Sequence, residues 1–152
     1  MTVDELHDVS VRAGTAGDAD ALALLDPVAG SDGGGRRESI ERWCRAGSVL
    51  VADGPAGVAG YCVVEYTFFE QGFVTMLMVA EGRRRHGIGE RLLRAAVVSC
   101  RTAKLFTSTN LSNQPMQRLL RRLGWYPAGM VHGLDDDDPE VFYLCHPREA
   151  DQ

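Results

Sequence analysis

The sequence predicts an α/β protein of about seven strands and about four helices. Short apolar stretches rich in β-branched residues alternate along the chain with segments whose apolar residues recur at helical spacing. Clusters of glycine, proline and aspartate separate them, as turn residues do. In chain order, the predicted strands are 9–12, 48–52, 58–69, 73–79, 105–109, 125–131 and 140–145, and the predicted helices are 20–25, 38–46, 88–97 and 116–123.

The N-terminal part begins with an alternating strand and continues into two helices. Thr15, followed by Asp18 three residues later, is the pattern that starts a helix. The glycine-rich stretch 30–35 breaks the chain and is expected to be a loop. The second helix places Ile40 and Trp43 on one face.

Three strands follow, after which the pattern changes to a helical period. Residues 53–57 are typical of a hairpin turn. The link 70–72 is short enough to make its two flanking strands antiparallel neighbours. Gly124 ends the last predicted helix, the acidic loop 134–140 joins the final two strands, and the tail after Pro147 is expected to be loose.

Length and composition limit the function classes. The 152 residues suit a single domain over 1–152, with its ordered part at about 9–146. No apolar run approaches the roughly 18 residues of a membrane helix, and Met1–Asp8 lacks the apolar core of a signal peptide. The net charge of −5 argues against a nucleic-acid partner. We therefore expect a cytoplasmic protein whose partners include neither nucleic acid nor a membrane.

The four cysteines lie far apart, with no CxxC pair, so no metal site is expected. Cys62 and Cys100 are expected to be small, buried, apolar residues. Disulfides are not expected in a reducing cytoplasm.

The segment 76–93 carries the strongest functional signal. A strand runs into a glycine-rich turn, and the turn opens a helix. Free N–H groups at a helix N-terminus, together with the helix dipole, bind phosphate. Gly87 and Gly89 remove side chains that would block a ligand, and Arg84 and Arg85 can add charge-assisted contacts. The sequence therefore predicts a phosphate-binding turn.

Two common phosphate motifs do not fit this turn. A Walker loop requires Lys and then Ser or Thr after Gly87, but the chain has Ile88 and Gly89 there. A dinucleotide fingerprint starting at Gly87 requires its third glycine at position 92, which is Leu92. The pattern that remains is Arg84-x-x-Gly87-x-Gly89.

This pattern resembles the pyrophosphate loop of the GNAT superfamily of N-acetyltransferases, which reads Gln/Arg-x-x-Gly-x-Gly/Ala. A downstream stretch is similar to the second hallmark of that family, Asn-x-x-apolar-x-x-Leu-x-x-x-Leu-Gly-aromatic. Its residues here are Asn113, Met116, Leu119, Leu123, Gly124 and Trp125. The resemblance extends from about residue 9 to residue 144. It implies the GNAT fold, with a mixed central sheet flanked by helices.

The resemblance also implies an activity. Members of this family bring acetyl-CoA and an amine together in a ternary complex, and the amine attacks the thioester directly. The acidic loop favours a small cationic acceptor. A protein or peptide N-acetyltransferase and a non-catalytic acyl-CoA-binding module remain alternatives. A homodimer is compatible with the family, and no metal is expected.

Acetyl-CoA is expected to lie along the strand and the turn, with a backbone N–H polarising the thioester carbonyl. The predicted cofactor-binding residues are Leu77, Met78, Val79, Arg84, Arg85, His86, Gly87, Ile88, Gly89, Glu90, Asn110 and Asn113. Asn113 could equally serve only as a helix cap.

Two proton transfers complete the predicted chemistry. Glu65, Glu70 and Glu140 are candidates for the base that accepts a proton from the ammonium group. Glu65 and Glu70 could also be ordinary strand-end and turn residues. The family acid, a tyrosine, corresponds here to Leu120. The possible substitutes are Ser112, Ser108, Asn110 and Tyr126. The predicted acceptor-binding residues are Tyr66, Phe68, Phe69, Asp138 and Glu140.

Overall fold

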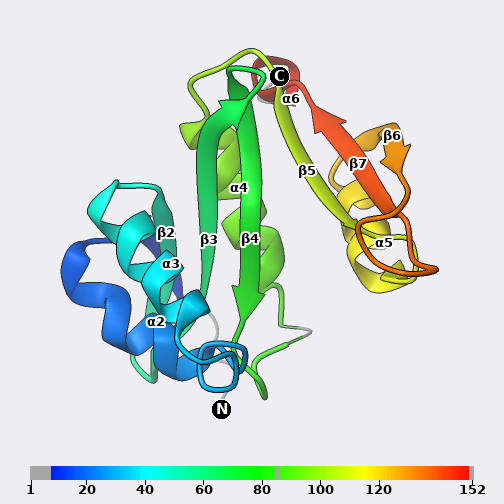
Figure 1. The fold of residues 1–152 in the computed structure, drawn as a ribbon. Coiled ribbons are helices and arrows are strands. Elements are labelled where there is room, and N and C mark those ends of the chain that lie inside the picture. Colours follow the sequence, from blue (N-terminus) through cyan, green and yellow to red (C-terminus); the bar gives the residue numbers. More distant parts are fainter. Residues whose placement is uncertain (1–7, 85, 151–152) are drawn as a thin grey trace. The chain divides into compact units, whose positions relative to one another are not determined.

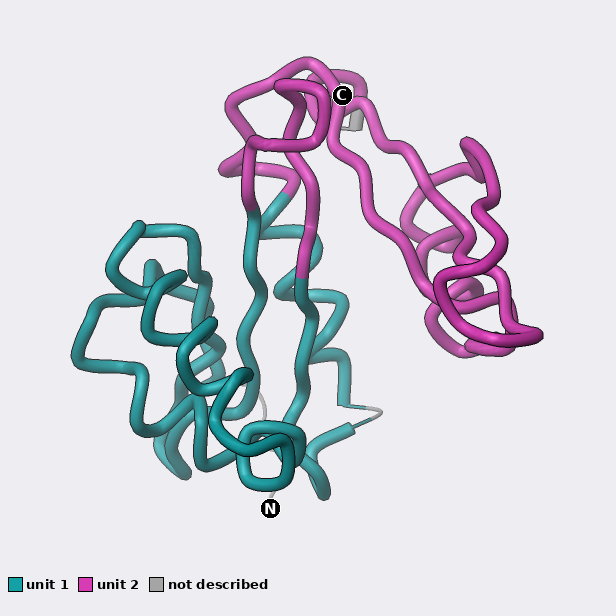
Figure 2. Tube along the Cα trace, in the orientation of Figure 1, with its two compact units in different colours: residues 1–64, 76–96 teal, residues 65–75, 97–152 magenta. Residues whose placement is uncertain are grey.

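The computed structural model describes residues 8–84 and 86–150. By its internal contacts the chain divides into two compact units, drawn in two colours in Figure 2. The first comprises residues 1–64 and 76–96, and the second comprises residues 65–75 and 97–152. Neither unit is a continuous segment, because the chain passes between them more than once.

The described residues form seven strands, five α-helices and one short 3-10 helix, η1 (Figure 1). In chain order they are β1 (Ser10–Ala13), η1 (Ala16–Asp18), α2 (Ala19–Leu25), α3 (Gly35–Arg45), β2 (Val49–Gly54), β3 (Gly57–Phe68), β4 (Gln71–Val79), α4 (Ile88–Ser99), β5 (Leu105–Asn110), α5 (Gln114–Arg122), β6 (Tyr126–Val131), β7 (Glu140–Cys145) and α6 (Pro147–Ala150).

The seven strands form one sheet in the order β1-β2-β3-β4-β5-β7-β6. Strand β4 pairs in parallel with β5, since residues 72–74 lie opposite residues 105–107. The β1–β2, β2–β3, β5–β7 and β6–β7 pairs are antiparallel. The predicted mixed sheet of about seven strands is confirmed.

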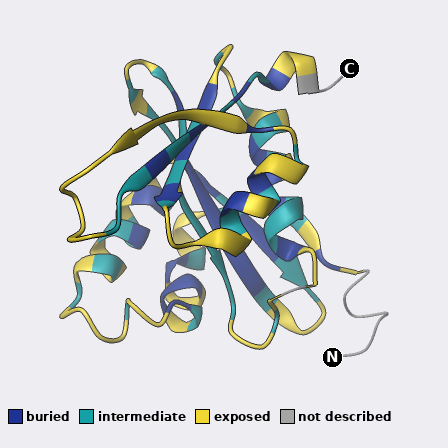
Figure 3. Cartoon of the chain, turned by 90° about the vertical axis from the view of Figure 1, so that its right-hand side faces the viewer, coloured by how far each residue is buried: buried dark blue, intermediate teal, exposed yellow. Residues whose placement is uncertain are grey.

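In the first unit, helices α2 and α3 pack on strands β2 and β3. Their apolar residues form one core with the strands, which includes Leu22, Ile40, Trp43, Val51 and Tyr61. Figure 3 shows buried residues running along the strands and along one side of the helices. The predicted helix start is confirmed, since the Thr15 N–H donates to Oδ2 of Asp18 at 2.7 Å.

In the second unit, Leu105, Leu120 and Tyr143 are fully buried. Helix α5 begins with a capped turn, because the Asn113 side chain accepts a hydrogen bond from the Met116 N–H. Proline in the first turn suits this helix start, since the early N–H groups have no partner inside the helix. Every residue of β6, at the edge of the sheet, is exposed.

Several predicted boundaries differ from the structure, among them the β3–β4 link, the start of α3 and the tail. The β3–β4 link is a turn of only two residues, Phe69 and Glu70, and both have positive φ, at 50° and 64°. Strand β4 therefore begins at Gln71 instead of residue 73. Helix α3 begins at Gly35 instead of residue 38, and the tail expected to be loose forms helix α6.

The four cysteines are free thiols, and three of them, Cys44, Cys62 and Cys145, are buried. The expectation for Cys62 is confirmed, and burial raises the pKa of its thiol to about 12. Cys100 differs from the expectation, because it is only partly buried. Its Sγ atom lies 3.4 Å from Oγ1 of Thr102. In the parts of the chain that the structure describes, no helix is both long enough and apolar enough to span a bilayer.

Candidate functional site

The candidate site is the turn that joins strand β4 to helix α4, within the first unit. The Arg83 N–H donates to the Ala80 carbonyl at 3.0 Å and closes a turn directly after the strand. Gly82 and Gly87 both have left-handed backbone, with φ values of 84° and 80°. The Arg91 N–H then donates to the Gly87 carbonyl at 3.1 Å, which begins the hydrogen bonding of the helix. The first turn of a helix is where N–H groups and the helix dipole commonly bind an anion.

The space beside both turn glycines is open. Among the described residues, and apart from its chain neighbours, no atom would lie within 4 Å of a Cβ atom placed on Gly82 or Gly87. Glycine is favoured at these positions by the backbone conformation, not by crowding within the protein. The first helical residue, Ile88, is different, because its side chain is buried in the core. Only its backbone can face a ligand.

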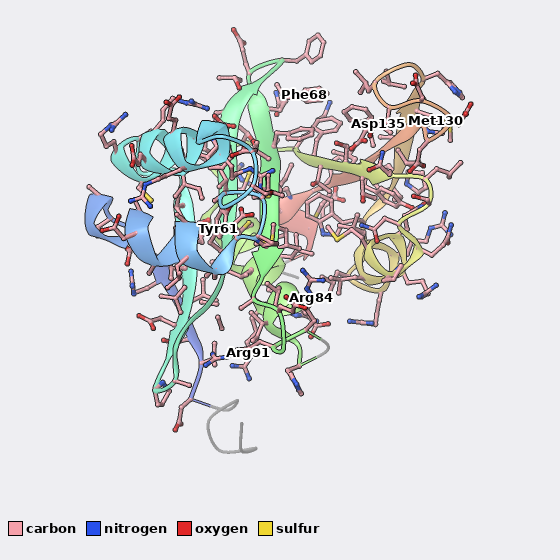
Figure 4. All side chains as sticks on the ribbon, turned by 60° about the horizontal axis from the view of Figure 1, so that its bottom comes forward. Tyr61, Phe68, Arg84, Arg91, Met130 and Asp135 are labelled. Carbon is pink, nitrogen blue, oxygen red and sulfur yellow. The ribbon has the colours of Figure 1, made fainter. Side chains whose placement is uncertain are left out.

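Arginine side chains give this turn positive charge (Figure 4). Arg84 is exposed, and its Nε lies 3.5 Å from the Val79 carbonyl. Arg83 donates from Nη2 to the Ala56 carbonyl at 3.0 Å. Its Nη1 is buried without a hydrogen-bond partner among the described residues. The turn therefore combines open backbone with cationic groups, as binding of an anion requires.

Three predicted cofactor residues beside Arg84 have different surroundings. Arg85 lies outside the described residues. His86 is exposed. Glu90 is partly buried in the first turn of α4, with its Oε2 3.9 Å from Nε of Arg94. The position of Gly89 in the same first turn fits a backbone contact.

The end of β4 that leads into the turn is held close to β3. Leu77, Met78 and Val79 are each partly buried. A Cβ atom on Gly60 of β3 would lie only 2.6 Å from the Met78 carbonyl oxygen and 3.3 Å from Cδ1 of Leu92 on α4. Glycine at position 60 thus permits the close approach of strand and helix that positions the turn.

Predicted residues of the β3–β4 hairpin lie in the second unit, where Glu65 and Tyr66 have protein partners. The Glu65 Oε1 accepts a hydrogen bond from the Thr75 hydroxyl at 2.7 Å. The Tyr66 hydroxyl accepts from the Arg101 N–H at 3.1 Å, and the Arg101 guanidinium lies 4.2 Å from the Tyr66 ring centre. Glu70 is in the hairpin turn before β4, and the phosphate-binding turn follows the other end of that strand.

The two predicted phenylalanines differ from each other. Phe68 packs among other aromatic rings, with centroid distances of 4.9 Å to Phe73, 5.2 Å to Phe106 and 5.8 Å to Phe142. Phe69 contacts Phe68 edge to face but remains 84% exposed. Phe68 therefore contributes to packing, whereas most of the Phe69 ring faces solvent.

The acidic loop and the end of β5 form a polar cluster within the second unit. The Asn110 amide donates to Oδ2 of Asp135 at 2.8 Å and to Oε2 of Glu140 at 3.3 Å. Ser112 donates twice to Asp138, from its N–H at 3.0 Å and from its hydroxyl at 2.6 Å. The structure thus brings four predicted residues together, and the Ser112 proton is directed at a carboxylate.

Position 120, where the family has its tyrosine, is fully buried here. The buried Tyr143 hydroxyl donates at 2.9 Å to Oε1 of Gln117, three residues before Leu120. Leu120 is therefore a core residue. Among the residues that the structure describes, no cluster of three or more His, Cys, Asp or Glu side chains could hold a metal ion.

Sequence reasoning missed a buried polar network in the first unit. Asp26, which is 1% exposed, accepts hydrogen bonds from the Tyr61 hydroxyl at 2.6 Å and from Nη1 of Arg36 at 2.8 Å. Asp26 precedes a proline and a glycine-rich stretch, so the sequence indicated only a loop. An aspartate directly after an apolar helix segment was the one available signal.

Comparisons with known proteins agree with this geometry. The family model described as the acetyltransferase (GNAT) family matches residues 22–125. A GNAT family acetyltransferase from Bacillus cereus ATCC 10987 has a crystal structure that is 26% identical, with a TM-score of 0.84 over 91% of this chain and 96% of that chain. The yncA protein of Salmonella typhimurium, solved with its cofactor acetyl-CoA, is 18% identical, with a TM-score of 0.77 over 92% of this chain and 94% of its own.

A sequence relative is also described as an N-acetyltransferase. A proposed ribosomal protein bS18-alanine N-acetyltransferase from Bacillus subtilis (strain 168) is 28% identical over 94 residues. The match covers 60% of this chain and 62% of the length of that relative. The family model spans well over half of the chain and includes both the phosphate-binding turn and the downstream hallmark. The chain belongs to the acetyltransferase (GNAT) family.

Proposed function

We propose that the protein is an acetyl-CoA-dependent N-acetyltransferase that moves the acetyl group to a primary amine by direct attack in a ternary complex. The observation that carries this proposal is the turn between β4 and α4, with its open glycines and exposed Arg84. Family membership supports the reaction type, and the complex of the Salmonella relative supports the choice of acetyl donor.

The residues of the turn fit the pyrophosphate of coenzyme A. The open space at Gly82 and Gly87 leaves room for phosphate oxygens beside the backbone. The N–H groups that begin α4 can donate to those oxygens. Arg84 can add a charge-assisted contact, and the unpartnered Nη1 of Arg83 lies in the same turn. Bound acetyl-CoA would supply the acetyl group as a thioester.

The chain itself must position the donor and move protons. In this proposal the backbone of residues 77–79 binds the pantetheine arm, and an N–H there polarises the thioester carbonyl. Glu65, Glu70 or Glu140 accepts a proton from the acceptor ammonium. The Ser112 hydroxyl, a candidate acid, donates to Oδ2 of Asp138 at 2.6 Å, so its proton is engaged by a carboxylate. Direct release of the thiolate is compatible with a thiol pKa of about 8.5.

Two acceptor classes are consistent with these features. The acidic residues Asp135, Asp138 and Glu140 favour a small cationic amine. The Bacillus subtilis relative, a proposed alanine N-acetyltransferase, favours the N-terminus of a protein. A non-catalytic acyl-CoA-binding module is a third candidate, since Leu120 occupies the position of the family tyrosine.

Calorimetric titration with acetyl-CoA, coenzyme A and NAD, followed by a thiol-release assay on a panel of amines, tests the proposal. We expect binding of acetyl-CoA and coenzyme A, no binding of NAD, and thiol release with at least one amine. Absence of acetyl-CoA binding would refute the assignment of the turn. Binding without turnover on any amine would favour the non-catalytic candidate.

A further inference from the structure

The inference concerns the phenylalanines of the chain, all of which lie in the second unit. There are five of them, and the Phe68 ring contacts the other four, Phe69, Phe73, Phe106 and Phe142, at centroid distances from 4.9 Å to 5.8 Å. None of the five is buried, since Phe69 is 84% exposed and the others are only partly buried. The buried core therefore uses no phenylalanine, and the whole supply forms one cluster, the phenylalanine face.

The phenylalanine face lies on the side of the strands that helix α5 does not cover. Along β5 and β7 buried and partly buried residues alternate, with Phe106 and Phe142 among the partly buried ones. The buried side of β7 packs on α5, where the Tyr143 hydroxyl donates to Oε1 of Gln117. Because successive side chains of a strand point to opposite sides, the two phenylalanines point away from this helix.

The tip of the β3–β4 hairpin adds a strained, exposed ring to this surface. Phe69 and Glu70 have left-handed backbone, with φ values of 50° and 64°. That backbone is unfavourable for residues with a Cβ atom, and hairpin turns usually place asparagine or glycine there. Leaving the ring in water is unfavourable as well. Both costs are unnecessary for reversing the chain, but they are consistent with a ring that contacts a partner.

The same side of the sheet changes from apolar to acidic along β7. Its partly buried residues are, in order, Leu144, Phe142 and Glu140, and successive ones are about 6.8 Å apart. Asn110 lies opposite Glu140, and its amide donates to Oε2 of Glu140 and to Oδ2 of Asp135. Among the described residues, no cation forms an ion pair with either carboxylate. One end of this surface is therefore aromatic, and the other end carries uncompensated negative charge.

Charge and area limit what can cover this surface. The acidic end repels nucleic acids and anionic membranes and attracts a basic group. Only one ring exposes most of its area of about 150–250 Å², so the apolar area is well below the roughly 800 Å² per partner of a stable interface between two folded proteins. A short extended segment fits better, because its alternate side chains lie on one side with the same spacing of about 6.8 Å.

We propose that the phenylalanine face is a docking surface for an extended polypeptide segment of a partner protein. The segment has apolar side chains at two alternate positions, which pack on the rings. At the next alternate position it has a basic side chain, which pairs with Glu140 and Asp135. The inference goes beyond the proposed function and does not rest on it, because this recognition requires neither an amine nor an acetyl donor.

Labelled phenylalanine is a direct probe of this surface, because every phenylalanine of the chain belongs to it. Full-length protein with isotopically labelled phenylalanine rings is titrated, under NMR observation, with the peptide Leu-Ser-Leu-Ser-Arg-Ser. The peptide is acetylated at its N-terminus and amidated at its C-terminus, so it contains no amine, and no acetyl-CoA is added. We expect the ring signals to shift and to saturate.

Two altered peptides test the charge and the pattern separately. Leu-Ser-Leu-Ser-Glu-Ser reverses the charge, and its Kd should be about fivefold higher or more. Leu-Leu-Ser-Ser-Arg-Ser has the composition of the first peptide but places the leucines on opposite sides of an extended chain, so it should also bind more weakly. The inference is overturned if the first peptide gives no saturable shift, or if either altered peptide binds as tightly.

Phe69→Asn separates a role in binding from a role in folding. Asparagine adopts left-handed backbone more readily than phenylalanine, so the melting temperature should be unchanged or higher. The Kd of the first peptide should rise about fivefold or more, because the exposed ring is lost. Leu24→Gln is the matched control, since Leu24 is 90% exposed on α2 of the first unit, and it should leave the Kd unchanged. An unchanged Kd in Phe69→Asn, or an equal rise in both variants, contradicts the inference.

Dilution of the protein without peptide tests the other possible occupant, a second copy of the chain. We expect the ring signals to stay constant on dilution. Signals that shift would show that copies of the chain cover the phenylalanine face, which overturns the inference. A separate titration with acetyl-CoA decides the proposed function, and the peptide titrations do not depend on its outcome.

Discussion

The Tyr61 hydroxyl donates a 2.6 Å hydrogen bond to the Asp26 carboxylate, and neither side chain is open to solvent. Burial and the neighbouring carboxylate both raise the pKa of Tyr61, so the phenol stays protonated and remains a donor. This contact ties the C-terminal end of α2, and the loop after it, to the middle of β3.

Removal of this one hydroxyl tests the strength of the contact. Tyr61→Phe should lower the free energy of unfolding by about 1.5–3 kcal/mol, because a buried charged acceptor loses a donor. Tyr143→Phe is the matched control, since its buried hydroxyl donates to the neutral amide of Gln117. Urea denaturation of both variants measures the losses. Equal losses would contradict the view that Asp26 is charged.

Acid should weaken the N-terminal part of the fold. Hydrogen bonding to Arg12, opposed by partial burial, lowers the pKa of Asp18 to about 2 from an ordinary value of 3.8. A lowered folded-state pKa stabilises the protein fully above the ordinary value, and the contribution disappears as pH falls from about 4 to about 2. Urea midpoints measured across this range should fall less in Asp18→Asn than in wild type. Asp20→Asn, altered at an exposed carboxylate of α2, should follow wild type.

Adding even one carbon atom at Gly60 should destabilise the protein. Gly60→Ala would place Cβ 2.6 Å from the Met78 carbonyl, so β4 must shift, at a cost of about 1–3 kcal/mol. The same shift should weaken acetyl-CoA binding, because Met78 is in the proposed pantetheine segment. Gly129→Ala on β6 is the control, because its Cβ meets no atom within 4 Å in the described part of the chain, apart from its chain neighbours. Urea denaturation measures the loss of stability, and calorimetry measures the loss of affinity for acetyl-CoA. Normal stability of Gly60→Ala would contradict the prediction.

Gly87→Val should impair cofactor binding more than folding. Valine at a φ of 80° carries a backbone strain of about 1–2 kcal/mol, but its Cβ meets no atom of the residues that the structure describes, beyond its chain neighbours. Gly47→Val imposes similar strain, at a φ of 72° and equally open space, after helix α3. We expect similar stability of the two variants and loss of coenzyme A binding only in Gly87→Val. Normal binding by Gly87→Val would show that the turn is not the pyrophosphate site.

Arg84 should contribute directly to the affinity for coenzyme A. Arg84→Ala should cost about 1.5–3 kcal/mol of binding free energy, the value of a charge-assisted hydrogen bond. Arg94→Ala removes an exposed arginine from helix α4, which follows the turn, and should have little effect on binding. Calorimetric Kd values for the two variants decide the matter. Equal affinities would refute a direct contact from Arg84.

The sequence predicted the elements well where local chemistry determines them. Asn113 caps α5 as its position in the motif indicated, and Gly82 and Gly87 have the backbone that only glycine adopts readily. The β3–β4 turn was misplaced because turn rules assign positive φ to glycine, whereas here Phe69 and Glu70 adopt it.

The Asp26 network could not be predicted for a different reason. Tyr61 lies 35 positions away from Asp26, and hydrogen bonding over such a separation leaves no local pattern. The apolar character of Leu120 indicated that this residue is buried. Which group protonates the leaving thiolate in place of the family tyrosine, however, depends on tertiary structure. Site residues whose partners are distant in the sequence can be identified only from the three-dimensional structure.

The buried cysteines also have a consequence for a protein that handles coenzyme A. A free thiol released close to an accessible cysteine can form a mixed disulfide after oxidation, and the thiolate fraction and the exposure of the cysteine control that reaction. Cys44, Cys62 and Cys145 are shielded, so Cys100 is the position at which such adducts would accumulate. A colorimetric assay that counts thiols should therefore have a background of about one reactive group per folded chain.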